Sequence, residues 1–391
     1  MSGSSTTDLQ QARKSHRRQR PVGRHSQSPT LPDAAHLLSR KGAMALGHNL
    51  FMTHTNDARH PYSELTPDRV MDALQDLGLW PDGRLLALSS YENRVYRAHL
   101  DEPVQGHAAV VLKFYRPGRW SRAQIQEEHD FAAELVAGEV PVVAPLVLNG
   151  QTLHQSAGFD FSVSPLRGGR APELDDFEVL EWIGRFLARI HTVGAAKPFV
   201  HRPTLDVQTF ALEPAEWLQT HQMIPLEVER EWREAFAAAL ALVQEIMAEG
   251  SSERRLIRLH GDCHPGNILW TPTELPGGGP HFVDLDDARM GPAVQDLWML
   301  LSGDRAQRTQ QLSALLDGYE QVRDFDRAEL RLIEPLRTLR LIHYSAWLAR
   351  RWEDPIFPVN FPWFGTPDYW RGQVLTLQEQ IERMQQAPLV V

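Results

Sequence analysis

Asp262 and Asn267 stand five residues apart in one short loop, within the segment LHGDCHPGNILW at residues 259–270. An apolar approach, Gly and Pro in the middle and an apolar exit predict a turn between two short strands. A second carboxylate, Asp284, ends the next apolar run, and the Gly- and Pro-rich residues 271–279 can close a hairpin between the two runs. This hairpin would bring Asp284 beside Asn267.

Carboxylate and amide oxygens are hard ligands that suit Mg²⁺, which takes few protein ligands and keeps several waters. Phosphoryl transfer needs metal-bridged phosphates and a carboxylate that orients the attacking hydroxyl and accepts its proton. We therefore predict that ATP is the co-substrate and that Asn267 and Asp284 hold Mg²⁺. Asp262 would act as the base. The predicted catalytic residues are thus Asp262 and the metal ligand Asp284. The alternative is a polar turn whose Asp and Asn only bond the backbone.

The motif His-Gly-Asp-x-His-x-x-Asn at residues 260–267, followed by Asp284, resembles the aminoglycoside phosphotransferase and choline kinase superfamily. More narrowly, SSYENRVY at 89–96, KFYRP at 113–117 and GPAVQDLW at 291–298 resemble bacterial stress-response serine/threonine protein kinases. The narrower resemblance covers about residues 61–391. It implies an α+β, protein-kinase-like bilobal fold with a small antiparallel sheet in the N-lobe and a mostly helical C-lobe.

The resemblance also implies an ATP site in the N-lobe. Lys113 ends an apolar β run, as the ATP-contacting lysine of kinases does on their third strand. Glu128 on the following helix would be its ion-pair partner, with the adjacent Glu127 as the alternative. Residues 88–96 contain no glycine, so backbone amides and the side chains of Ser90 and Asn93 would contact the phosphates. A serine that only supports the turn is the alternative for Ser90.

Several polar residues around the motif are expected to support it. His260 would brace the loop through hydrogen bonds. Asp296 either caps the helix that it begins or, as the resemblance implies, holds the backbone of the catalytic loop. Asp286 and Asp287 could recruit a second Mg²⁺ or form ion pairs with Arg289, and we favour support roles for both.

The elements that must position these residues differ between the two parts of the chain. After a helix that begins with Thr66 and ends near Gly78, residues 61–166 show one further helix at 121–137 and strand-like runs at 85–88, 95–100, 109–115, 146–153 and 159–163. Residues 167–391 show helical patterns at 177–191, 226–247, 295–301, 312–322, 328–351 and 369–386. Residues 1–60 lack apolar periodicity and are basic, which predicts a disordered extension.

Composition limits the possible partners and location. The chain has 391 residues, 42% of them hydrophobic, a net charge of −10 and one cysteine, Cys263. A single cysteine allows no internal disulfide, and no apolar run is long enough to cross a membrane, which favours a cytoplasmic protein without membrane contact. The basic residues gather near the N-terminus, so the rest is acidic and disfavours nucleic acid. We expect a monomer.

Three functions are compatible with these sequence features. The first is transfer of the γ-phosphoryl group of ATP to Ser or Thr hydroxyls of proteins, as the resemblance implies for a stress-response kinase. The second is a small-alcohol kinase that acts on choline, homoserine or an aminoglycoside-like acceptor. The third is a nucleotide-binding regulator without turnover. No Ser, Thr or Tyr lies between Asp287 and Asp296, so phosphorylation of an activation segment there is not expected.

Overall fold

The structure is a computed structural model, and it describes residues 60–391. The predicted disordered extension therefore lies outside the described residues, apart from His60. No helix within residues 60–391 is both long and apolar enough to cross a membrane.

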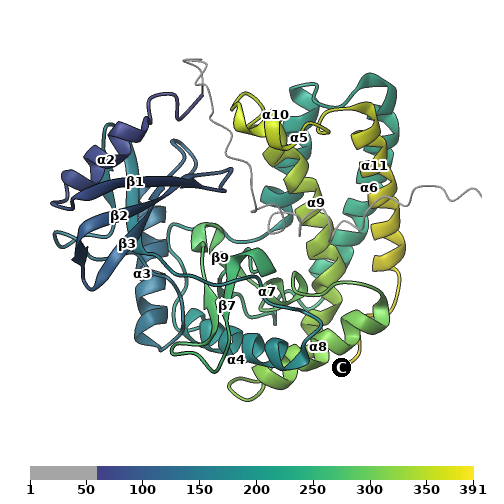
Figure 1. Ribbon diagram of the computed structural model, residues 1–391. Coiled ribbons are helices and arrows are strands. Elements are labelled where there is room, and N and C mark those ends of the chain that lie inside the picture. The colour runs from purple at the N-terminus through teal and green to yellow at the C-terminus, as the bar shows by residue number, and fades with distance from the viewer. Residues whose placement is uncertain (1–59) are drawn as a thin grey trace, which may run out of the picture. The chain divides into compact units, whose positions relative to one another are not determined.

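Five antiparallel strands form the first part of the fold, which we call the N-lobe (Figure 1). In spatial order these are β1 (Pro81–Leu88), β2 (Arg94–Val104), β3 (His107–Phe114), β5 (Phe159–Pro165) and β4 (His154–Ser156). The predicted strand at 146–153 is wrong. Asn149 and Gly150 both have positive φ, 49° and 77°, and reverse the chain between Leu148 and Gln151, so β4 begins only at His154.

The sheet separates a hydrophobic face from the face that carries Lys113. Successive side chains of a strand point to opposite faces, so Leu112 and Phe114 are buried on one face while Lys113 between them points to the other. Val95 and Ser162 lie directly opposite Lys113 on the two neighbouring strands. These three side chains therefore share one face of the sheet.

Two helices accompany this sheet, as predicted. Helix α2 (Pro67–Gln75) begins after Thr66, whose hydroxyl accepts a hydrogen bond from the Arg69 amide, and it packs on the hydrophobic face of the sheet. Helix α3 (Arg122–Ala137) begins with a capping box formed by Ser121 and Gln124. Its buried residues include Glu128, which thereby lies on the inner side of the helix.

The second part of the described chain, which we call the C-lobe, is mostly helical. Its longer helices are α4 (Phe177–Gly194), α6 (Leu226–Ala248), α8 (Arg305–Tyr319), α9 (Ile333–Ala349) and α11 (Pro367–Met384). Helices α6, α9 and α11 pack side by side (Figure 1). An antiparallel sheet followed by a helical part confirms the predicted α+β class. The exact boundary at residue 166 stays a prediction.

Several helix bounds differ from the prediction for local reasons. Helix α8 begins earlier than expected because Asp304 and Gln307 form a capping box. The predicted helix 328–351 is divided into a 3₁₀ segment, η4 (Arg327–Leu332), and α9. The predicted helix 295–301 is the short α7 (Gln295–Trp298). Helices α5 (Glu213–Thr220) and α10 (Ile356–Asn360) were not predicted.

Short strands of the C-lobe flank the two predicted polar turns. The predicted hairpin is present as β7 (Ile268–Thr271) and β8 (Gly279–Phe282), paired antiparallel with Ile268 opposite Phe282. A second pair is formed by β6 (Ile257–Leu259) and β9 (Arg289–Gly291). These two pairs enclose the segments 260–267 and 283–288, so both polar turns emerge from neighbouring strands.

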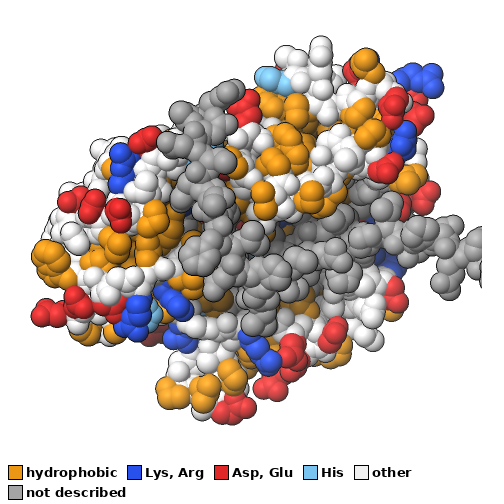
Figure 2. Space-filling model, turned by 45° about the horizontal axis from the view of Figure 1, so that its top comes forward, with side chains coloured by type: hydrophobic (Ala, Val, Ile, Leu, Met, Phe, Trp, Pro, Cys, Tyr) orange, Lys and Arg blue, Asp and Glu red, His pale blue; other side chains and the backbone are white. Residues whose placement is uncertain are grey.

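The surface mixes charges of both signs. Figure 2 shows acidic and basic side chains interspersed over the face that it displays, with hydrophobic side chains between them. On the part of that face where described residues are visible, the acidic side chains are not gathered into one patch.

Candidate active site

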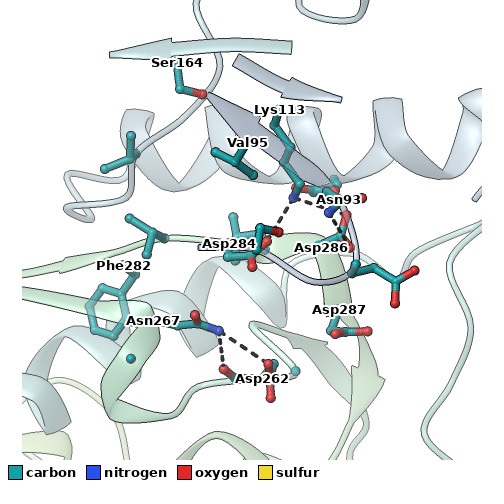
Figure 3. Close-up of a pocket in the computed structure, with 18 of the residues that line it drawn as sticks. Asn93, Val95, Lys113, Ser164, Asp262, Asn267, Phe282, Asp284, Asp286 and Asp287 are labelled. Carbon is teal, nitrogen blue, oxygen red and sulfur yellow. Dashed lines mark hydrogen bonds and ion pairs between the residues drawn. The ribbon is translucent and has the colours of Figure 1, made fainter. Parts of the chain in front are cut away.

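A cavity of about 510 Å³ lies between the N-lobe sheet and the short C-lobe strands. This volume is in the range of small-molecule sites. The residues predicted as functional all line it: Ser90, Lys113, Glu128, Asp262, Asn267 and Asp284. Figure 3 shows Lys113 reaching down from the sheet toward Asp284, while Asn267 and Asp262 lie on the opposite side. The two polar turns and the N-lobe lysine therefore meet in one place.

The loop that contains Asp262 and Asn267 is held by one buried carboxylate from α7. Asp296 accepts hydrogen bonds from the backbone amides of His260 and Gly261, each at 2.8 Å, and pairs with His191 Nε2 at 3.1 Å. Gly261 has a φ of 85°, and a side chain there would collide with the carbonyl of Asp287. Of the two roles considered for Asp296, the structure therefore favours holding the loop.

We expect Asp296→Asn to lower the free energy of unfolding by about 2–3 kcal/mol, the loss for a buried hydrogen-bonded charge, and to reduce turnover as well. Urea unfolding followed by tryptophan fluorescence measures the first effect. Asp304→Asn is the matched control, because Asn caps a helix as well as Asp does. Equal stability of the two variants would contradict the assignment.

Asp284 has an unusual backbone conformation at the end of the hairpin. Val283 before it donates a backbone hydrogen bond to the carbonyl of Asn267 at 3.0 Å, which ties the two turns together. Asp284 itself has φ 63° and ψ 62°, a left-handed conformation that costs energy in a residue other than glycine. Its side chain is 51% exposed and lines the cavity. Such strain is typical of functional sites.

Asp262 and Asn267 contact each other inside the loop. The Asn267 side-chain amide donates to the backbone carbonyl of Asp262 at 2.9 Å and lies 3.4 Å from its carboxylate. The Asn267 oxygen is then turned away from Asp262 (Figure 3). The carboxylate of Asp262 also pairs with Arg340 on α9 at 2.6 Å and lies 3.6 Å from His264 Nε2.

Lys113 is surrounded by three carboxylates. Its ammonium lies 2.9 Å from Asp284, 3.2 Å from Asp286 and 3.8 Å from Glu128. Burial alone would lower the pKa of Lys113, but these charges raise it well above its usual range, so the lysine stays protonated.

Glu128 is the glutamate that contacts Lys113. Its other oxygen pairs with Arg202 at 2.9 Å. Glu127 points elsewhere and accepts hydrogen bonds from the backbone amides of residues 200–202. The geometry thus distinguishes two neighbours that the sequence left open, while the functional role of Glu128 stays a prediction.

Asp286 and Asp287 line the cavity, and each forms ion pairs with basic side chains. Asp286 pairs with Arg119 and Lys113, and Asp287 pairs with Arg119 and Arg289 at 2.8 Å each. Burial would raise the pKa of Asp286, but Arg119 and Lys113 lower it to about 2. Both carboxylates therefore stay ionised and paired, in agreement with support roles.

The donor set at Asn267 and Asp284 fits Mg²⁺. One half-exposed carboxylate and one amide oxygen are hard donors that leave room for waters and phosphate oxygens. Among residues 60–391, no cluster of three or more His, Cys, Asp or Glu has the arrangement of a metal site built wholly from protein. A site for Mg²⁺ here would be completed by nucleotide and water.

Sequence reasoning missed the arginines of the site. Arg340, Arg119 and Arg202 contact Asp262, Asp286 and Glu128, yet no local pattern marks them.

Asn93 was expected to contact phosphate. It lines the cavity, and its side chain donates to Asp286 at 3.2 Å and accepts from the Arg116 amide at 3.1 Å. The phosphate contact stays a prediction. Cys263 is buried, and burial raises the pKa of its thiol.

Comparison with known proteins shows to which family the chain belongs. Residues 84–333 match the model of the phosphotransferase enzyme family, which is more than half of the chain. The chain belongs to this phosphotransferase family. The matched segment contains both polar turns and Lys113. The superfamily resemblance noted in the sequence is thereby confirmed.

Curated relatives narrow the group within the phosphotransferase family. Stress response kinase A of Escherichia coli strain K12 is 46% identical over 335 residues, which cover 85% of this chain and 98% of the relative. Serine/threonine protein kinase RdoA of Salmonella typhimurium strain LT2 is 46% identical over 334 residues, with the same coverage. The narrower resemblance predicted for residues 61–391 is thus confirmed.

Solved phosphotransferase structures share the fold at low identity. Amicoumacin kinase hAmiN, in complex with AMP-PNP and Ca²⁺, has a TM-score of 0.62 at 18% identity and covers 83% of this chain and 95% of its own. A microcompartment-associated aminopropanol kinase has the same score and identity, covering 81% and 97%. These likenesses support the kinase-like fold.

Proposed function

We propose that the protein transfers the γ-phosphoryl group of ATP to Ser or Thr hydroxyls of proteins, with Mg²⁺ held by Asn267 and Asp284. The observation that carries the proposal is that Lys113, Asp262, Asn267 and Asp284 line one cavity. The nucleotide would bind between the sheet and the hairpin, and the acceptor would approach Asp262.

Each side chain has a separate task in this proposal. Lys113, kept charged by its carboxylate neighbours, orients the phosphates of ATP. Asp262 holds the acceptor hydroxyl and takes its proton at a carboxylate oxygen. Glu128 holds Lys113 in place. Mg²⁺, when bound, supplies positive charge that offsets the charge developing on the phosphates.

The acceptor is proposed from the curated relatives, of which one is named a serine/threonine protein kinase and another a stress response kinase. Each match covers 85% of this chain. The solved structures named for small-molecule acceptors are only 18% identical and support the fold alone. We further propose that the reaction takes place in the cytoplasm and that a monomer performs it, since all the residues invoked come from one chain.

We expect labelled phosphate from ATP to appear on Ser and Thr of added protein, with casein as the probe, and not on choline, homoserine or an aminoglycoside. Mass spectrometry of each mixture, with and without Mg²⁺, measures the transfer. Transfer to one of the small alcohols alone would replace the protein acceptor by that class. Equal ATP consumption by wild type and Asp262→Ala would instead support a regulator without turnover.

A further inference from the structure

The turn between β1 and β2, residues 89–93, lines the cavity beside Lys113. In protein kinases a glycine-rich loop at this place covers the phosphates with its backbone amides. This turn has no glycine, and its Asn93 is buried with both side-chain groups committed to Asp286 and to the Arg116 amide. The turn must therefore be placed correctly by its surroundings.

Two N-lobe arginines donate hydrogen bonds to the backbone of this turn, and both form ion pairs with one C-lobe carboxylate. Arg116 Nε donates to the carbonyl of Glu92 at 3.1 Å, and Arg94 Nη1 donates to that of Tyr91 at 3.3 Å. Their other nitrogens meet Asp354, with Arg94 Nη2 at 2.9 Å from both oxygens and Arg116 Nη2 at 2.6 Å. Asp354 is only 2% exposed.

The side chain of Glu92 adds a second link to the C-lobe. It accepts a hydrogen bond from Trp347 Nε1 at 2.5 Å and pairs with Arg351 at 2.6 Å, both from α9 or its C-terminal end. Arg116 pairs with the same carboxylate at 3.1 Å. The turn is thus bonded to the C-lobe through its backbone and through its side chains.

We propose that Asp354 is a positioning residue that fixes turn 89–93 over the phosphates of ATP, a role that rests on the proposed function. A buried carboxylate shared by two arginines has one favourable geometry, and losing it removes an ion-pair partner from Arg94 and from the buried Arg116. With Asp354 in place, the amides and the Ser89 and Ser90 hydroxyls are held ready before nucleotide binds. Such preorganisation lowers the cost of binding.

The test compares ATP with adenosine on Asp354→Asn. We expect the dissociation constant of MgATP, measured by calorimetry, to rise about tenfold or more. This is the loss of affinity that corresponds to one or two charged hydrogen bonds. Adenosine lacks phosphates, so its affinity should stay within about twofold. Equal weakening of both ligands would reveal a general structural role, and unchanged MgATP affinity would remove the proposal.

Two further variants keep the result interpretable. Arg94→Gln leaves the Arg116–Asp354 pair intact and should weaken the binding of MgATP by a smaller factor. This variant tests the proposal if Asp354→Asn does not fold.

Glu134→Gln is the matched control, because Glu134 on α3 pairs with Arg258 on β6 at 2.8 Å without touching the turn. MgATP weakened equally by Glu134→Gln would overturn the proposal, whereas a wild type that binds no MgATP would overturn the proposed function itself.

Discussion

Replacing Asp262 with asparagine is expected to lower the phosphoryl-transfer rate by about 10²–10⁴-fold, the usual contribution of a positioned general base. Asparagine keeps the size of the side chain and can still receive a hydrogen bond, but it cannot take the proton of the acceptor hydroxyl. The affinity for MgATP should change little, because Asp262 lies across the cavity from Lys113 (Figure 3). Single-turnover rates and calorimetric nucleotide binding measure the two quantities separately.

Arg340→Gln separates loss of the base from loss of its ion pair. Arg340 contacts the Asp262 carboxylate at 2.6 Å, so Asp262→Asn removes this pair as well. If the carboxylate itself is what matters, Arg340→Gln retains much more activity than Asp262→Asn. Similar losses in both variants would assign the effect to the ion pair and contradict the role of Asp262 as base.

The two polar turns of the site could be predicted because the sequence signals that form them are local. Asp262 and Asn267 lie in one loop, and a single hairpin brings Asp284 beside them, so turn residues and apolar runs suffice. The choice between Glu127 and Glu128 could not be made in this way. Neighbouring helical residues point about 100° apart, and which of them faces Lys113 depends on how α3 packs against the C-lobe.

The arginines and acids around the turn 89–93 could not be predicted for a different reason. Arg94 and Asp354 are 260 residues apart in the chain, and no periodic pattern connects them. Asp354 follows the segment Arg-Arg-Trp-Glu at 350–353, in which three of four residues are charged, as is typical of an exposed helix end. Only the tertiary structure buries the carboxylate of Asp354, where it forms ion pairs with Arg94 and Arg116.

The second large effect is expected at the hairpin. Asp284→Asn should abolish the Mg²⁺ dependence of ATP binding, because a neutral amide replaces the one half-exposed carboxylate of the donor pair. Calorimetry of ATP with MgCl₂ or with EDTA measures this without relying on turnover. In the wild type, Mg²⁺ should tighten binding, and in Asp284→Asn the two titrations should coincide.

Asp287→Asn is the matched control for this experiment. Asp287 belongs to the same short segment, but its carboxylate is paired with Arg119 and Arg289 and is not assigned to the metal. This variant should keep the difference between the Mg²⁺ and EDTA titrations. Asp284→Asn also removes one of the three carboxylates around Lys113, so binding in EDTA could change on its own account. Only the difference between the two titrations reports on the metal, and a full difference in Asp284→Asn would show that Asp284 is not a Mg²⁺ ligand.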